Sequence, residues 1–334
     1  MMKYFLCRWF TVVALSTASA GMAAPVLFPV VVGDRWGFVD KSGETVIQPQ
    51  FDEVKMFSEG LAPVKIVRWG YVDNAGKVAI NPQFDKAEVF SEGLAVVKLG
   101  GKVSLANPFG GGGRCGYINA DGKYIINPQF DGAGKFSGGL AAVKRDGRWG
   151  YIDKAGKMTI NLQFDEAGDF SEGLAAVKLA ERFGYVDTAG KMAINPQFER
   201  AQAFSEGLAA VRDGGRWGFV DWAGKIVINP QFDEAGSFAK GLAPVRKGKL
   251  WGYINPAGGC VIRPQFDEAA AFSEKLAPVR EAGRWGYVNP AGKLAIHPQF
   301  DEAWGFTNNL ARVKLGSRFG YINAEGKYVW NPAN

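Results

Sequence analysis

Residues 140–173 read LAAVKRDGRWGYIDKAGKMTINLQFDEAGDFSEG, and variants of this stretch fill almost the whole chain. The Trp-Gly dipeptide inside it recurs nine times, in some copies with another residue in place of Trp. The recurring glycines are Gly37, Gly70, Gly116, Gly150, Gly184, Gly218, Gly252, Gly286 and Gly320. Six of the eight spacings between them are 34 residues, and the other two are 33 and 46. A constant period in this range is typical of repeat proteins, in which each unit buries its apolar face against its neighbours.

One unit predicts three short antiparallel strands joined by tight turns. Its β-branched and aromatic residues favour strands, and its glycine-containing pairs favour hairpin turns. In the quoted unit the expected strands are 140–144, 148–153 and 157–161, and residues 163–172 link them to the next unit. Gly156 in the second turn recurs in all nine units, and we expect it to take a positive φ. The linker glycine after Ser-Glu is replaced late in the chain by Lys275 and Asn309, so we expect the link at Lys275 to be strained or differently turned.

The reading frame of the repeat bears on how the units assemble. Leu27–Val32 resembles a first strand and Lys327–Trp330 a third strand, so each of the nine meanders is complete within its own stretch of chain. A closed propeller often completes one blade with strands from both termini, and it usually has four to eight blades. We therefore expect an all-β, open and curved solenoid-like array of nine three-stranded antiparallel meanders. A closed propeller-like ring is the alternative.

The first residues differ from the repeats. Lys3 and Arg8 precede a small and apolar stretch that ends in Ala18-Ser19-Ala20, which is the pattern of a secretory signal peptide. We expect a signal peptide over 1–20 and one repeat domain over 21–334, exported to the bacterial periplasm, secreted or associated with the cell envelope. The stretch is too short for a membrane span, and no span is expected after its removal.

The composition excludes several classes of partner and site. Residues 1–20 hold two of the 39 Lys and Arg and none of the 33 Asp and Glu, so removing them leaves a net charge of +4. This charge is small, and both signs alternate along each unit, so no nucleic-acid partner is expected. Cys115 and Cys260 lie four units apart, and we expect no bridge between them. With one histidine, His297, in a polar repeat position, we expect neither a metal site, nor a cofactor, nor a histidine-dependent triad.

The repeated charges are expected to be structural. Carboxylates such as Asp165 recur after the third strand, and an Arg such as Arg148 precedes most Trp-Gly pairs. A ladder of like charges is unfavourable, so we expect the acids to pair with the arginines, and the Asp to cap a turn.

The whole pattern resembles the bacterial WG-repeat family, also called KWG repeats. The resemblance rests on Arg-Trp-Gly-Tyr-Ile-Asp, Gly-Lys, Ile-Asn-Pro-Gln-Phe-Asp and Phe-Ser-Glu-Gly-Leu-Ala, and it covers residues 27–332. Departures from the pattern include Cys115, Phe183 and Phe319 at the Trp position and Leu162 at the Pro position. The resemblance implies a structural class with no shared catalytic residues.

Function must then be sought where the repeat lapses. Leu99–Gly113 contains a 12-residue insertion rich in glycine, which we interpret as a projecting flexible loop with a contact residue at Phe109. Its Gly111, Gly113 and Gly116 match G-x-G-x-x-G, but the required strand and helix are missing around them. Trp222 stands in a hairpin turn and Trp304 in a linker, where other residues are usual, and both are candidate partner contacts. Trp304 has the alternative role of covering the last units.

We expect a non-enzymatic, monomeric scaffold that binds a protein or another macromolecule over an extended surface. The alternative is a protein that binds cell-wall or other cell-envelope polysaccharide through its repeated aromatic residues. That alternative requires the Trp of the Trp-Gly pairs to be accessible.

Overall fold

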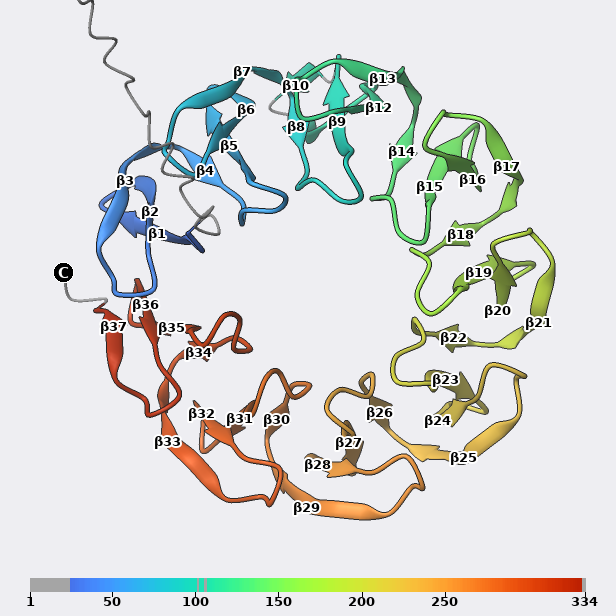
Figure 1. Ribbon diagram of the computed structural model, residues 1–334. Coiled ribbons are helices and arrows are strands. Elements are labelled where there is room, and N and C mark those ends of the chain that lie inside the picture. The colour runs from blue at the N-terminus through green and yellow to red at the C-terminus, as the bar shows by residue number, and fades with distance from the viewer. Residues whose placement is uncertain (1–24, 101, 105–106, 332–334) are drawn as a thin grey trace, which may run out of the picture.

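The computed structural model describes residues 25–100, 102–104 and 107–331, without the side chains of 102–104 and 107–111. The expected signal peptide, residues 1–20, therefore lies outside the described residues. Nine sheets follow one another around a ring (Figure 1), and we call them blades 1 to 9 in chain order. The described residues contain no helix long and apolar enough to cross a membrane.

Each blade places its strands in chain order from the middle of the ring outward (Figure 1). The short innermost strands are β4 (Glu53–Val54), β8 (Lys86–Ala87), β14 (Gly132–Ala133), β18 (Glu166–Ala167), β22 (Arg200–Ala201), β26 (Glu234–Ala235), β30 (Glu268–Ala269) and β34 (Glu302–Ala303). The first long strands are β1 (Phe28–Val32), β5 (Leu61–Ile66), β9 (Ala95–Leu99), β15 (Leu140–Arg145), β19 (Leu174–Leu179), β23 (Ala209–Asp213), β27 (Ala243–Lys247), β31 (Ala277–Glu281) and β35 (Ala311–Leu315). The second are β2 (Arg35–Val39), β6 (Arg68–Asp73), β12 (Arg114–Ile118), β16 (Arg148–Asp153), β20 (Arg182–Asp187), β24 (Arg216–Val220), β28 (Leu250–Ile254), β32 (Arg284–Val288) and β36 (Arg318–Ile322). The outermost are β3 (Thr45–Phe51), β7 (Val78–Phe84), β13 (Tyr124–Phe130), β17 (Met158–Phe164), β21 (Met192–Phe198), β25 (Ile226–Phe232), β29 (Cys260–Phe266), β33 (Leu294–Phe300) and β37 (Tyr328–Trp330).

The meander has a fourth strand that the sequence did not predict. The three expected strands are present in every blade, but two linker residues add a short strand to blades 2 to 9. In blade 5, Glu166 and Ala167 pair with Lys178 and Val177 of β19. Two residues with no β-forming side chain give no periodic signal, so the linker was expected to be irregular throughout. Blade 1 has three strands among the described residues.

Successive blades are joined by a repeated aromatic contact. In blade 4, the Tyr151 ring is fully buried and lies 4.8 Å from that of Phe170, which belongs to the linker of blade 5. The Tyr151 hydroxyl donates to the Gly168 carbonyl at 2.8 Å. Aromatic residues therefore fill the space between sheets, and each blade depends on the next for burial and for a hydrogen-bond acceptor.

The open array was the wrong choice, and the ring fits the structure. Tyr321 of blade 9 makes the same kind of contact with blade 1, since its hydroxyl donates to the Pro29 carbonyl at 2.9 Å. Its ring centroid lies 5.4 Å from that of Phe28, and both side chains are buried. Over residues 25–331 as described above, no strand is exchanged between these two blades. Closure by side-chain packing alone leaves no trace in the reading frame, which is why the frame misled the prediction.

The second-turn glycine behaves as expected. Gly156 has a φ of +81°, and its eight equivalents lie between +77° and +87°. The link at Lys275 was expected to be strained or differently turned, and the structure shows a different turn. Lys275 does not take a positive φ, whereas Glu274 before it does, at +53°.

The glycine of the Trp-Gly pair is required for a different reason, because two backbones approach each other closely at this position. Trp149 pairs with Phe164 and Tyr151 with Ile160, so one residue of β16 faces three of β17 in a bulge. A Cβ on Gly150 would lie 2.5 Å from the Ile160 carbonyl oxygen and 2.8 Å from the Asn161 carbonyl carbon. Only glycine fits at such distances from backbone atoms.

The repeated charges pair as expected. Arg148 forms an ion pair with Asp165, and equivalent pairs occur in five other blades. The Asp165 carboxylate also accepts from the Ala180 backbone N–H at 3.1 Å, in the first turn of blade 5. The Asp caps that turn and connects two blades.

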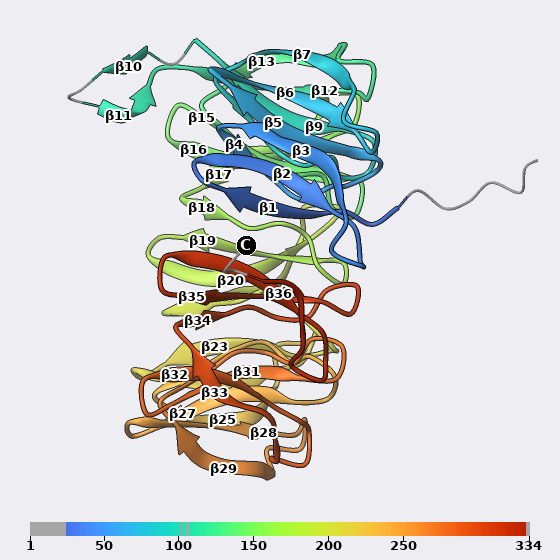
Figure 2. The ribbon, with the colours of Figure 1, turned by 90° about the vertical axis from the view of Figure 1, so that its left-hand side faces the viewer.

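The 12-residue insertion was expected to be a flexible loop, and it contains a two-stranded antiparallel ribbon. Its strands are β10 (Lys102–Ser104) and β11 (Asn107–Gly111). The ribbon projects from one rim of the ring (Figure 2). The other rim carries the second turns and the Ser-Glu-Gly linkers, as contacts between Trp222 and the linkers of blades 5 and 6 indicate.

The close approach at the bulge predicts a large effect for Gly150→Ala. Because the new methyl group meets backbone, we expect a loss of about 1–3 kcal/mol, as for other overpacked sites, seen as a lower midpoint of thermal unfolding. Gly168→Ala is the matched control, since its nearest neighbour is the Ala176 carbonyl oxygen at 3.5 Å, which is ordinary contact. Equal midpoints for the two variants would contradict the packing explanation.

Because the ring is closed, we expect Tyr321→Ala and Tyr151→Ala to lower the free energy of unfolding by the same amount. Each removes a buried ring and a hydrogen bond, so we expect a loss of about 3–5 kcal/mol from either, measured by thermal or urea unfolding. In an open array Tyr321 would face solvent. A much smaller effect at Tyr321 than at Tyr151 would therefore show that the ends do not meet in solution.

Candidate functional site

Residues whose chemistry differs from blade to blade adjoin the short innermost strands, on the side nearest the middle of the ring (Figure 1). They are the two residues that follow each short strand, and we call them the inner wall. The inner wall consists of Lys55-Met56, Glu88-Val89, Gly134-Lys135, Gly168-Asp169, Gln202-Ala203, Gly236-Ser237, Ala270-Ala271 and Trp304-Gly305. The next residue is Phe in all eight cases. Each of these short segments thus combines two residues whose chemistry changes between blades with a Phe that does not change.

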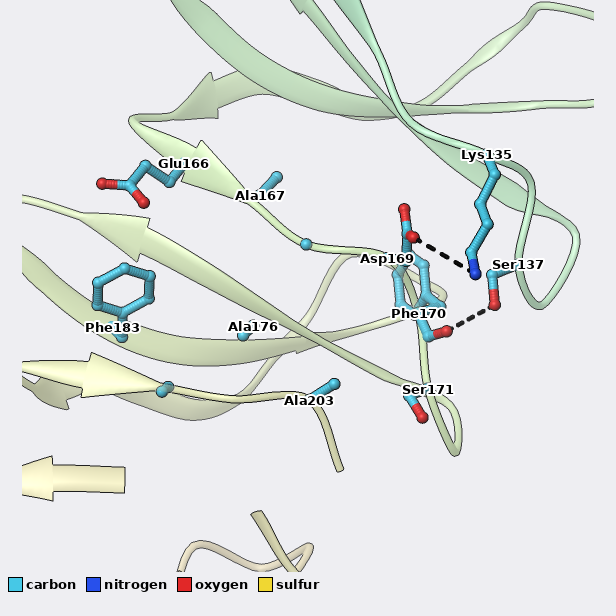
Figure 3. A pocket seen from close by; sticks show the side chains of 12 residues that line it. Lys135, Ser137, Glu166, Ala167, Asp169, Phe170, Ser171, Ala176, Phe183 and Ala203 are labelled. Atoms are coloured by element: carbon cyan, nitrogen blue, oxygen red, sulfur yellow. Dashed lines mark hydrogen bonds and ion pairs between the residues drawn. The ribbon is translucent and has the colours of Figure 1, made fainter. Parts of the chain in front are cut away.

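A cavity of about 570 Å³ opens on the inner wall of blades 4, 5 and 6. Figure 3 shows Lys135 and Asp169 at one end of it, on consecutive linkers. The other end is lined by Phe183, Ala176 and Ala203. The cavity therefore presents the Lys135 and Asp169 charges at one end, and at the other the Glu166 carboxylate beside apolar side chains (Figure 3).

The charged end of the cavity is open to a ligand. Lys135 Nζ lies 4.0 Å from Asp169 Oδ2, at the limit of an ion pair, and the two side chains keep 54% and 41% of their surface exposed. Gly134 permits this position of Asp169, because a Cβ on Gly134 would lie 2.9 Å from Asp169 Oδ1. At this distance and exposure the pair contributes little stability, and each group can still bind a partner.

The environment of Asp169 raises the pKa of its carboxyl group. Desolvation by the surrounding protein raises the pKa of the Asp169 carboxyl above its usual 3.8, and the nearby Lys135 ammonium opposes the shift. Desolvation is also the main cause of the raised pKa of Tyr151, to which the Asp169 charge adds. The cavity is thus a place where a carboxylate is poorly solvated and gains from a new hydrogen-bond donor.

The hydroxyl groups of the cavity serve the fold. Ser137 Oγ donates to the Phe170 carbonyl and Ser171 Oγ to the Phe204 carbonyl, both at 2.7 Å. The same bond recurs in three other linkers. The hydroxyl hydrogens of these serines are thus donated to backbone carbonyls of the next linker.

Other inner-wall residues also pair with the next blade. Lys55 Nζ lies 2.5 Å from Glu88 Oε2 between blades 2 and 3. Gln202 accepts from Ser237 Oγ at 3.1 Å between blades 6 and 7. The polar inner-wall groups thus alternate in sign and type around the ring, with no concentration of one charge.

Trp222 is exposed, as its position in a turn suggested. Its side chain keeps 55% of its surface accessible, and its Nε1 donates to Glu172 Oε2 at 3.3 Å. Lys154 in the equivalent turn of blade 4 reaches Glu92 at 3.1 Å, so this turn position normally contacts the preceding linker. Trp222 is not among the residues that line the inner-wall cavity.

The other two candidate partner contacts, Trp304 and Phe109, differ in what the structure shows of them. Trp304 is partly buried against Arg312 and Phe319, with the Arg312 guanidinium 4.2 Å from its ring centroid, so it covers the last blade as the alternative interpretation expected. Phe109 belongs to β11, and its side chain lies outside the described residues. The three candidate contacts are not brought together at one place.

The remaining candidates are structural or isolated. His297 is exposed on an outer strand. Cys115 is buried and Cys260 exposed, and neither forms a disulfide. Over residues 25–100, 102–104 and 107–331, no group of three or more His, Cys, Asp or Glu side chains is arranged to hold a metal ion.

Sequence reasoning missed Lys135 and Asp169 because it searched for lapses in the constant positions. The signal was available in the two variable positions before each linker Phe, which carry Lys, Glu, Asp, Gln or Trp in different units. Nothing in the sequence places those positions toward the middle of a ring.

The raised pKa of Asp169 predicts how Asp169→Asn changes stability with pH. Between pH 3.8 and the folded pKa the native state binds more protons than the unfolded state, so stability falls as pH rises through this window. Removing the carboxyl should therefore make the variant more stable than the parent at pH 7, with the gap closing below pH 3.8. Thermal unfolding at several pH values measures this.

Asp40→Asn is a control variant for which the expected change in stability at pH 7 has the opposite sign. The Ser42 hydroxyl hydrogen bond holds the pKa of Asp40 below its usual value, so its charged form stabilises the fold at neutral pH and this variant should lose stability there. If Asp169→Asn also lost stability at pH 7, desolvation of Asp169 would not be the dominant effect.

Comparison with solved structures supports the ring. A structure described as "Crystal structure of the eukaryotic initiation factor" superimposes with a TM-score of 0.67 at 10% identity, covering 92% of this chain and 95% of that one. Hsv2p from Kluyveromyces lactis gives a TM-score of 0.40 at 11% identity, covering 58% of this chain and 72% of that one. At such identities the first likeness indicates a shared fold alone.

A search of the curated proteins gives no match. The family model described as "WG containing repeat" matches residues 36–66, 69–102, 116–149, 149–181, 183–217, 217–251, 251–285 and 285–318. These matches cover well over half of the chain, and each runs from the second long strand of one blade to the first long strand of the next. The chain belongs to the WG-repeat family, and in it nine repeats build a ring of nine β-propeller-like blades.

Proposed function

We propose that this protein is a non-enzymatic scaffold that binds a protein partner through the inner wall of its ring. One observation carries the proposal, namely that the two inner-wall residues differ in chemistry from blade to blade while the Phe that follows them is constant. Repeated surfaces offer the same contacts nine times and cannot select one partner by themselves. A segment whose side chains differ in every blade can do so.

The character of the inner wall favours a polypeptide. The Lys135–Asp169 cavity combines charged side chains of both signs with the apolar side chains of Phe183 and Ala203, and it suits a segment that carries polar and apolar groups together. Alternating charges give no continuous positive surface for phosphates, so nucleic acid is not proposed as the partner.

A polysaccharide partner is the second candidate, and the observation that favours it is the exposed Trp222. The repeated Trp are less suited to stacking on sugars. Trp69 keeps 7% of its surface exposed, and Trp149 is partly buried against the core, with the Lys144 ammonium 5.9 Å from its ring centroid. Trp222 offers a free indole face whose orientation is fixed by Glu172.

We further propose that the protein acts as a monomer outside the cytoplasm. The proposal of export rests on the residue pattern of Met1–Ala20, and that of a non-catalytic role on the commitment of Ser137 and Ser171 to the fold. No cofactor is proposed.

Substitutions on the inner wall should abolish recovery of the partner. Lys135→Ala combined with Asp169→Ala should fold normally, since Ala203 and Ala271 stand at the same positions in other blades. With the tagged protein as bait in an envelope extract, we expect at least a tenfold loss of the specifically recovered protein by quantitative mass spectrometry.

The matched control is Lys249→Ala combined with Asp213→Ala, which makes the same charge changes at exposed positions on the first turns. It should recover the partner as well as the parent does. Equal recovery by all three proteins would exclude the inner wall of blades 4 to 6 as the binding site. Loss only with Trp222→Ala, together with binding to polysaccharide, would favour the second candidate.

A further inference from the structure

The seam between blades 9 and 1 differs from the other seams. In blades 2 to 9 the first residue after the short strand bonds back to the first long strand, as Gly168 N–H does to the Ala176 carbonyl at 2.9 Å. That residue also accepts the tyrosine hydroxyl of the preceding blade in six seams, as Gly168 does from Tyr151. The described part of the chain places no such segment before β1. Tyr321 instead donates directly to Pro29, whose carbonyl corresponds to that of Ala176.

A cavity of about 250 Å³ lies at this seam. It lies among residues of blades 9, 1 and 2, namely Trp304, Leu310, Arg312, Tyr321, Phe28 and Met56. Most of these side chains are apolar, and Met56 keeps 39% of its surface exposed. Methionine adapts its shape to a ligand more readily than the branched residues do.

Among the described residues that line this cavity, only Arg312 carries a charged side chain, and its position is unusual for the repeat. Equivalent positions hold small or apolar residues, as at Ala176, Ala210 and Pro278. The Arg312 guanidinium lies 4.2 Å from the ring centroid of Trp304 and 4.5 Å from that of Phe319. Its Nε is buried without a hydrogen-bond partner.

Arg312 also differs from the arginines at the rim. Arg148 and its equivalents pair with carboxylates, whereas none of the carboxylates that the structure describes forms an ion pair with Arg312. A guanidinium that lies over two aromatic rings, and that has no carboxylate partner among the described residues, can bind a carboxylate in a bidentate manner. An unpaired cation in mostly apolar surroundings gains more from such a ligand than a solvated one does.

We propose that this cavity binds the C-terminal residue of a peptide chain, with its carboxylate on Arg312 and its apolar side chain between Met56, Trp304 and Tyr321. The volume is below the roughly 300–1,000 Å³ of sites for drug-sized ligands, which fits one terminal residue. A chain-terminal apolar residue carries its carboxylate next to an apolar side chain, which an internal Asp or Glu does not. This site is separate from the Lys135–Asp169 cavity and does not depend on the partner proposed for it.

The test is fluorescence polarisation with a fluorescein-labelled tetraglycyl-leucine peptide. The full chain should bind the peptide with a free carboxylate in a saturable manner, and the C-terminal amide of the same peptide at least tenfold more weakly. Arg312→Ala should lose at least tenfold in affinity for the free carboxylate. This variant restores the residue of blades 4 to 6, so the fold should be retained, and thermal unfolding checks it.

Two controls separate this site from others. N-acetyl-leucine should compete with the labelled peptide if the terminal residue alone is recognised. The Lys135→Ala and Asp169→Ala double variant should bind as the parent does, so that this site and the inner-wall proposal can fail independently. Equal binding of acid and amide, equal binding by Arg312→Ala, or no saturation up to millimolar protein would overturn the proposal. The comparison of acid and amide needs no variant and holds even if Arg312→Ala unfolds.

Discussion

The contact between the Trp-Gly glycine and the backbone of the outermost strand determines how each blade is built. Because Gly150 has no side chain, β17 can fold its bulge against β16 at a distance that any Cβ would prevent. The bulge sets the register on either side of it, pairing Trp149 with Phe164 and Tyr151 with Ile160. Tyr151 is thereby placed so that its hydroxyl reaches the next blade, where Gly168 accepts it. One close backbone contact within a sheet thus leads to the bond between sheets.

The outermost strand also shows why the repeat needs its proline. Most of these strands contain Pro within the bulge, as at Pro128 and Pro264, and such a residue has no N–H to donate. A proline is tolerated in an edge strand or a bulge, and here it occupies both. It also discourages another chain from pairing with the exposed edge. The glycine and the proline therefore serve one bulge from opposite strands.

Much of the blade could be predicted from the sequence, since strand and turn signals act over a few residues. The three meander strands, the positive φ of Gly156 and the pairing of Arg148 with Asp165 all follow from local pattern and elementary electrostatics. The short strand β18 could not be predicted, because Glu166 and Ala167 are extended only through pairing with β19. Closure could not be predicted either. It depends on the small rotation between neighbouring blades, which side-chain packing sets and which no residue pattern records.

The candidate site was missed for the same reason. Lys135 and Asp169 are 34 residues apart and meet only because consecutive linkers lie side by side at the middle of the ring. In a structure with nine equivalent blades, a residue at a variable position gains neighbours from the blades before and after it. Specificity can then arise from a few substitutions without altering the fold, since neither Gly150 nor Tyr151 is involved. The seam between blades 9 and 1 extends this argument, because there one linker is absent among the described residues and Arg312 stands where Ala176 stands in blade 5. The repeated residues build the fold, and the positions that differ between repeats, such as Asp169 and Arg312, can evolve to bind a ligand without disturbing it.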